Sequence, residues 1–284
     1  MDNLELLKQL PDESVDLIYC DILYNTGRKF DDYDDDLGGT SEAIDWYRPR
    51  LIEMHRVLKI TGSIYLHMDN RLSSYVRVLM DDIFGEDMFI NEIIWHYSKM
   101  NNTNNKFIPN HDNILLYSKT DKYKFYPQYN EVESALKQRL RRFIKDNKIV
   151  YKSVKNHSSQ LMDNYIRSAK NRLGKEELDD SDVVIDFKGK GKQKVDTVWK
   201  IPIIRGNSHE RVDYDTQKPK ALLERIVKAS SNEGDVVADF FMGSGTAIEV
   251  AKELGRNYIG CDINPRAIEI TQERLEELKV NSNI

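Results

Sequence analysis

Apolar residues in this chain form two patterns, short continuous runs and stretches with helical spacing. The short runs predict buried strands, and they lie at Val15–Cys20, Ser63–His67, Phe89–Tyr97, Asn113–Tyr117, Val236–Phe240 and Tyr258–Cys261. Helical spacing predicts amphipathic helices at Leu4–Leu10, from Ser41 to about Leu58, and at Leu72–Phe84, Lys220–Ser230 and Ala247–Leu254. Strands that alternate with helices predict an α/β fold with a mostly parallel sheet.

The stretch from Val236 to Asn264 reads as strand, turn, helix and second strand. Gly243 and Gly245 in the turn allow a ligand to approach the backbone at the carboxyl end of the strand. Asp262 follows Asp239 at roughly the 20-residue separation at which an acidic residue accepts ribose hydroxyls. The turn lacks the GxGxxG pattern and the lysine of a phosphate-binding loop. The pattern therefore favours a nucleoside ligand that needs no phosphate cradle.

Length and composition describe a water-soluble chain. Its 284 residues suit one large domain or one domain with an insert, and its mean hydropathy is −0.61. No apolar run approaches the ~18 residues of a membrane span, and the first ten residues lack a signal pattern. We expect a cytoplasmic protein without a membrane partner. Cys20 and Cys261 are too few for a metal cluster, and we expect two reduced, buried side chains and no bound metal.

Charge is unevenly distributed along the chain. The net charge is −5, yet the segment from Asp121 to Lys194 has 18 basic and 11 acidic residues. This segment predicts a basic module, inserted at roughly 120–195, that faces a polyanion. A solvated lysine-rich surface is the alternative. Within the segment, Glu131–Ile144 is predicted as a helix that crowds four basic side chains together, namely Lys137, Arg139, Arg141 and Arg142.

A second acidic strand end lies at Asp21, with an aromatic residue, Tyr24, three positions later. This pair suits chemistry on an amino group attached to an aromatic base, a poor nucleophile because its lone pair is delocalised into the ring. A carboxylate and a backbone carbonyl that accept its two hydrogens help to localise that lone pair. The ring of Tyr24 could stack on a base extruded from a duplex. A solvent-exposed aspartate turn is the simpler alternative.

Together these segments resemble the amino DNA methyltransferases that use S-adenosylmethionine, in the β arrangement, where the catalytic motif precedes the cofactor motif. Three stretches carry the resemblance: DILYNTG at Asp21–Gly27, TQKP at Thr216–Pro219 and DFFMGSGT at Asp239–Thr246. Further similar segments are GSIYLHMD at Gly62–Asp69, the run that ends at Trp95, and HDNILLYSK at His111–Lys119.

The resemblance implies a Rossmann-like, doubly wound fold in circularly permuted order. Residues 1–119 would form its catalytic part, 120–195 a target-recognition insert, and 196–284 its cofactor-binding part. The catalytic residues would be Asp21, Tyr24 and the carbonyl of Ile22. The residues that would bind S-adenosylmethionine are Asp239, Phe241, Gly243, Gly245, Thr246 and Asp262, with Gln217 and Lys218 near its methionine end. Double-stranded DNA would be contacted by Asn25, Lys137, Arg139, Arg141 and Arg142.

An aspartate at the first catalytic position resembles the adenine-N6 enzymes more than the cytosine-N4 enzymes, which often begin with serine. The sequence departs from the family's Asp-Pro-Pro-Tyr pattern because Ile22 and Leu23 replace both prolines, which removes the φ restraint on the turn. We expect activity to survive this change. Cytosine-N4 methylation, RNA methylation and a DNA-binding relative with impaired catalysis stay open as alternatives, as do a homodimer and a separate restriction nuclease.

Overall fold

The computed structural model describes residues 1–30, 33–99, 105–133, 144–145, 148–149 and 190–281, with single positions at 167, 171 and 176. The chain divides into two compact units, one of Met1–Gln128 with Asp196–Ile284, the other of Tyr129–Val195. The first unit thus extends beyond the boundary expected after Lys119. Within the described ranges, the helices lack the combination of length and apolar character needed to cross a membrane.

The first unit is built on a seven-stranded sheet in the order β11-β5-β6-β4-β1-β12-β13. Its strands are β1 (Val15–Asp21), β4 (Leu58–Met68), β5 (Phe89–His96), β6 (His111–Ser118), β11 (Val198–Lys200), β12 (Val236–Asp239) and β13 (Asn257–Gly260). Neighbouring strands pair in parallel except on both sides of β6. A small antiparallel pair joins β2 (Arg28–Lys29) to β3 (Asp34–Asp35). The mostly parallel sheet and its helices confirm the predicted fold class.

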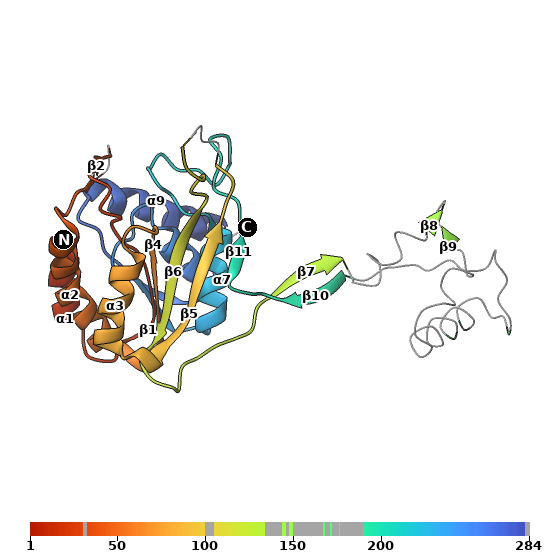
Figure 1. Cartoon of the computed structure of the whole chain (residues 1–284), viewed down its shortest axis with the longest axis horizontal. Helices are drawn as coiled ribbons and strands as arrows, with labels where there is room; N and C mark the ends of the chain where they lie inside the picture. The colour runs from red at the N-terminus through yellow and green to blue at the C-terminus, as the bar shows by residue number, and fades with distance from the viewer. Residues whose placement is uncertain are drawn as a thin grey trace. The chain divides into compact units, whose positions relative to one another are not determined.

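Helices form two groups, on opposite faces of the sheet (Figure 1). The first group comprises α1 (Asn3–Gln9), α2 (Thr40–Val57) and α3 (Ser73–Phe84), followed by the short 3-10 helix η1 (Glu86–Met88). The second comprises α7 (Lys220–Ser230), α8 (Thr246–Glu253) and α9 (Pro265–Asn281). This arrangement explains the continuous apolar runs, because a strand covered on both faces has no solvent-facing side.

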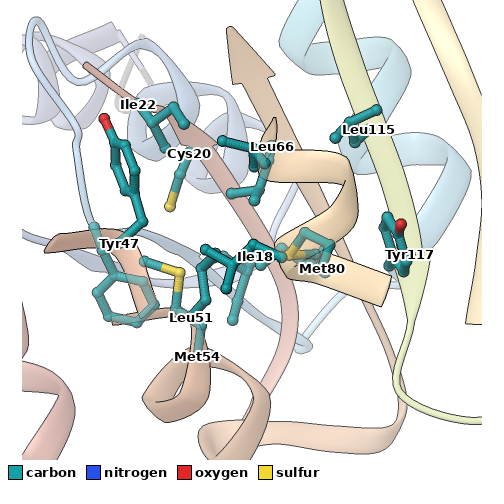
Figure 2. Close-up of a cluster of buried hydrophobic side chains, with 14 of the residues drawn as sticks. Ile18, Cys20, Ile22, Tyr47, Leu51, Met54, Leu66, Met80, Leu115 and Tyr117 are labelled. Carbon is teal, nitrogen blue, oxygen red and sulfur yellow. The ribbon is translucent and has the colours of Figure 1, made fainter. Parts of the chain in front are cut away.

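The core beneath α2 positions the end of β1. Alternate residues of β1 point toward α2, whose apolar residues recur at helical spacing. Figure 2 shows this contact, which brings together Ile18, Cys20, Ile22, Tyr47, Leu51 and Met54. Both cysteines are buried and free, as expected. Since β1 is fixed from both faces, its last residue, Asp21, has a defined place at the sheet edge.

Two sequence-based expectations about the first unit are wrong. No strand was predicted near Val198, but Val198–Lys200 forms β11, which pairs in parallel with β5. A three-residue strand is too short to leave a periodic pattern, and this one is fixed by the indole N–H of Trp95, which donates to the carbonyl of Ile201 (2.8 Å). The strand expected at Ser63–His67 also begins earlier than predicted, because β4 starts at Leu58, directly after α2.

In the second unit, β7 (Tyr129–Glu133) pairs with β10 (Lys190–Lys194), and β8 (Ile144–Lys145) pairs with β9 (Lys148–Ile149). The helix expected from Glu131 is therefore wrong in its first residues, which belong to β7, and at Ile144, which begins β8. Most of that segment, with Lys137, Arg139, Arg141 and Arg142, lies outside the described residues.

Candidate active site

The candidate active site lies where the parallel strands end. Asp21 closes β1, and Asp262 follows β13 by two residues, at the same edge of the sheet. A cavity of about 1350 Å³ opens there, and both aspartates line it. A pocket for one drug-sized ligand measures about 300–1,000 Å³. This cavity therefore has room for a nucleoside and a second aromatic base at once.

Each carboxylate oxygen of Asp21 has a close partner, and Nδ1 of His67 lies 3.7 Å from Oδ1. The hydroxyl of Tyr24 donates to Oδ1 (2.9 Å), and the Nζ of Lys218 forms a short ion pair with Oδ2. The same Nζ lies 5.5 Å from the centroid of the Tyr24 ring. The fold thus brings together the DILY and TQKP segments, which are far apart along the chain.

A buried polar network behind Tyr24 was not anticipated from the sequence. His67 is fully buried, and its Nε2 lies 3.3 Å from Oδ2 of Asp112 while its Nδ1 lies 2.8 Å from the hydroxyl of Tyr19. Tyr97 donates to the other oxygen of Asp112 (3.0 Å), and Tyr24 lies 3.4 Å from Oδ2. The signal that could have revealed this network is the polar residue at the edge of each apolar run, in SIYLH and HDNILL.

The network sets the charge state of its members. Burial alone would raise the pKa of Asp112, but hydrogen bonds from His67 and Tyr97 and the charges of His67 and Lys218 lower it below its usual value. Asp112 is therefore a carboxylate at neutral pH. Burial, together with the nearby charges of Asp21 and Asp112, raises the pKa of Tyr24 well above its usual value. Tyr24 therefore remains a neutral hydroxyl that can donate a hydrogen bond.

The turn after Asp21 is fixed by hydrogen bonds, although it lacks the two prolines of the family pattern. Tyr47 donates its hydroxyl hydrogen to the carbonyl of Leu23 (2.6 Å), and the backbone N–H of Ile22 bonds to the carbonyl of His67 (3.1 Å). The buried carboxylate of Asp35 accepts the N–H groups of Asn25 and Thr26 at 2.9 and 3.0 Å. Side chains from α2 and β3 thereby supply the restraint that proline rings would give.

Asn25, which we expected from the sequence to contact DNA, has a structural role in this turn. Its φ of 52° lies in the left-handed region, which asparagine tolerates better than most residues. Its side chain accepts from Leu37 N–H (2.7 Å) and donates to the Gly38 carbonyl (2.9 Å). The side-chain oxygen and amide group of Asn25 are thus both used within the protein.

Asp262, which lines the same cavity, is oriented by two backbone N–H groups. Gly243 donates to Oδ2 (2.9 Å) and Asn264 donates to Oδ1 (2.8 Å). Burial raises the pKa of Asp262 above its usual value, and these two hydrogen bonds oppose that shift. Gly243 has a φ of +47°, and an added Cβ would lie 3.2 Å from the Tyr214 ring. The carboxylate and the close backbone approach fit the ribose of a nucleoside.

Three of the expected cofactor residues stabilise the turn that carries this part of the cavity. Asp239 is buried and accepts the N–H of Phe241 (3.0 Å). Gly245 has a φ of +73°, and a Cβ there would lie 2.2 Å from the hydroxyl oxygen of Thr271. Thr246 is buried at the start of α8. None of these three lines the large cavity, whereas Phe241 and Gly243 do.

Gln217 also serves mainly to hold a loop. Its side-chain oxygen accepts the N–H of Val212 (2.8 Å), and its amide donates to the carbonyl of Glu210 (2.7 Å). It lines the cavity beside Lys218. In the TQKP segment, Gln217 therefore stabilises a loop, whereas Lys218 contacts the carboxylate of Asp21.

Comparisons with known proteins identify the family of this chain. The model of a family described as DNA methylase, N6_N4_Mtase, matches residues 15–273. Type II methyltransferase M.HpaI of Haemophilus parainfluenzae is 31% identical over 274 residues, which cover 96% of this chain and 72% of that protein. DNA adenine methyltransferase YhdJ of Escherichia coli K12 is 28% identical over 281 residues, which cover 97% of this chain and 81% of that protein.

Solved structures show the same fold. The PvuII DNA methyltransferase, described as cytosine-N4-specific, superposes with a TM-score of 0.59 at 16% identity, over 96% of this chain and 84% of that chain. A DNA modification methylase of Thermus thermophilus, in complex with S-adenosyl-L-methionine, gives a TM-score of 0.55 at 19% identity. The superposition covers 96% of this chain and 90% of that chain. On the family match and the identity to M.HpaI, this chain belongs to the DNA methylase family.

Proposed function

We propose that this protein transfers a methyl group from S-adenosylmethionine to the exocyclic N6 of adenine in double-stranded DNA. The observation that carries the proposal is that Asp21 and Asp262, far apart in sequence, line one cavity. One part of that cavity suits a nucleoside, and another presents a carboxylate and an aromatic ring. The adenine preference rests on the aspartate that begins the DILY motif and on the similarity to an adenine methyltransferase.

The residues present fit the cofactor. Asp262 is oriented to accept ribose hydroxyls, and Phe241 and Ile263 line the same part of the cavity with apolar surface suited to a purine ring. When bound, S-adenosylmethionine supplies an electrophilic methyl group on a positively charged sulfur. The protein's task is then to hold the acceptor nitrogen in line with that methyl group.

In the proposed complex, Asp21 exchanges one of its present partners for adenine. Both of its oxygens are already engaged, one by Tyr24 and one by Lys218. An adenine amino group that enters over the Tyr24 ring replaces the ammonium of Lys218 at Oδ2. Asp21 then accepts one amino hydrogen and the carbonyl of Ile22 the other, which localises the nitrogen lone pair for attack. We further propose that the unit Tyr129–Val195 recognises the target sequence, because its stretch of the chain is strongly basic.

The proposed reaction predicts N6-methyladenine in the DNA of bacteria that express this protein and lack methyltransferases of their own. Genomic DNA would be digested to nucleosides and analysed by mass spectrometry, with cells that carry an empty vector as the control. N4-methylcytosine in place of N6-methyladenine would support the cytosine alternative. DNA without any methylated base, together with measurable donor binding, would support the impaired DNA-binding relative.

The ribose role of Asp262 predicts that Asp262→Ala weakens donor binding. Loss of a partly buried, charge-assisted hydrogen bond costs about 1–3 kcal/mol, which corresponds to a dissociation constant raised by about 5- to 150-fold. Titration calorimetry with S-adenosylmethionine measures this directly. Asp45→Ala, an exposed change on α2, is the matched control and should leave the affinity unchanged. Equal donor affinity in Asp262→Ala and the unmodified protein would rule out the assignment.

A further inference from the structure

The connection between β5 and β6 carries a phenylalanine with no packing partner among the described residues. Phe107 is 99% exposed, the most exposed large hydrophobic side chain in the part of the chain that the structure describes. Ile108 beside it is 44% exposed. Burial of a phenylalanine side chain is strongly favourable, so this one contributes nothing to the stability of the free protein.

Phe107 also lies at the mouth of the active-site cavity. Thirteen large hydrophobic side chains are exposed in the described residues. Only two of these thirteen line the cavity, Phe107 and Ile263. Ile263 adjoins Asp262 at the proposed donor end, whereas Phe107 belongs to the segment that leads into Asp112. The exposed ring is therefore associated with the end of the cavity proposed to take the base.

The base of the connection is fixed to the catalytic residues. His96 pairs with His111 across the two strands, and the N–H of Tyr97 donates to the carbonyl of Asn110 (3.0 Å). Asp112 follows immediately and contacts the Tyr24 hydroxyl at 3.4 Å. An extended chain spans about 3.4 Å per residue. Five residues therefore keep the backbone of Phe107 within roughly 17 Å of Asp112.

The residues that line this cavity include both acidic and basic side chains, and some of the basic ones belong to the connection that carries Phe107. Lys106 precedes Phe107, and Lys99 at the other end of the connection and Arg28 in β2 also line the cavity. Basic side chains at this place attract DNA phosphates.

We infer that Phe107 inserts into the duplex at the target site and occupies the space left by the extruded adenine. This inference rests on the proposed function, because an adenine can reach Asp21 only if it leaves the base stack. Extrusion costs stacking and pairing energy, and apolar side chains that insert between base steps in other DNA-binding proteins act as wedges of this kind. Phe107 acts on the DNA and touches no reacting atom, so it is a positioning residue.

The test uses Phe107→Ala and a duplex that carries 2-aminopurine at the target adenine, a probe whose fluorescence rises when it unstacks. The target site comes first from sequencing methylated bases in DNA from cells that express the unmodified protein. We expect the unmodified protein to increase the fluorescence several-fold and Phe107→Ala to lose most of that increase. Methyl transfer to the ordinary paired duplex should fall at least tenfold in this variant, with donor affinity unchanged.

A second duplex separates a wedge from other roles. If the target adenine faces an abasic position, it is already unpaired and needs no wedge, so Phe107→Ala should regain most of its transfer rate there. Phe107→Trp should retain flipping on the paired duplex. Phe125→Ala, which removes an exposed ring that is remote from the cavity lining, is the matched control.

Two outcomes would overturn the inference. One is a Phe107→Ala variant whose fluorescence increase and methyl-transfer rate on the paired duplex equal those of the unmodified protein. The other is a methyl-transfer rate that falls equally on the paired and the abasic duplex. That result would show that the ring acts in a step other than extrusion of the base. Failure of the proposed function is a different result, because the unmodified protein itself would then methylate no DNA.

Discussion

Replacement of Asp21 by asparagine is expected to lower the rate of methyl transfer by at least about 10³-fold, or about 4 kcal/mol of transition-state stabilisation. The asparagine amide keeps the size of the side chain but removes the negative charge that the developing positive charge on the adenine nitrogen requires. It also presents Lys218 with a neutral partner in place of a carboxylate. Single-turnover transfer of a labelled methyl group, with enzyme in excess over DNA, measures the chemical step.

Donor binding in this variant should be nearly unchanged, because the residues proposed to hold the donor, Asp262, Phe241 and Ile263, are left intact. Asp87→Asn, an exposed change in η1, provides the matched control and should transfer at the normal rate. A single-turnover rate of Asp21→Asn within tenfold of the unmodified protein would show that the carboxylate does not act on the amino group.

The largest expected effect on stability concerns Arg274 of α9. This buried guanidinium donates to Glu249 from Nε (2.8 Å) and, in a short ion pair, from one terminal nitrogen. Its other terminal nitrogen donates to the carbonyl of Ser244 (2.8 Å). Loss of one partner of a buried ion pair costs about 3–5 kcal/mol. Because Lys220 lies 2.7 Å from Glu249 and remains there, we expect Arg274→Met to cost about 3 kcal/mol.

Urea denaturation followed by circular dichroism measures this loss of unfolding free energy. Arg266→Met on the same helix is the control, since its contact with Asp213 is 3.5 Å long and exposed, and it should cost less than about 1 kcal/mol. Arg274→Met should also weaken donor binding, because the Ser244 carbonyl belongs to the turn beside Gly243. Equal urea midpoints for Arg274→Met and Arg266→Met would show that the buried pair of Arg274 and Glu249 does not stabilise the turn.

The sequence predicted the central strands and most helices well because their burial on both faces left long apolar runs. It failed where stability comes from contacts distant in sequence. β11 has three residues and depends on pairing with β5, which no local pattern encodes. The start of β4 was misplaced because α2 passes directly into the strand at Leu58, without the glycine or proline signal that a prediction relies on.

Within the site, spacing and resemblance located Asp21, Tyr24 and Asp262, all of which line one cavity. Their partners could not be read in the same way. His67 and Asp112 meet only because β4 and β6 are antiparallel neighbours. The polar contacts of Asn25 and Gln217 are likewise set by backbone groups of nearby loops. A motif shows which residue types are present, whereas the register of the sheet decides what they touch.

The turn after Asp21 makes the residues tolerated at several positions depend on one another. Where two prolines stiffen a loop, the stiffness is local and survives changes elsewhere. Here the Leu23 carbonyl is anchored by Tyr47 of α2, and the following amides are anchored by Asp35. The residues tolerated at Tyr47 and Asp35 therefore depend on which residues occupy positions 22 and 23. Loss of Tyr47 would therefore both release the Leu23 carbonyl and open a cavity in the core beside β1.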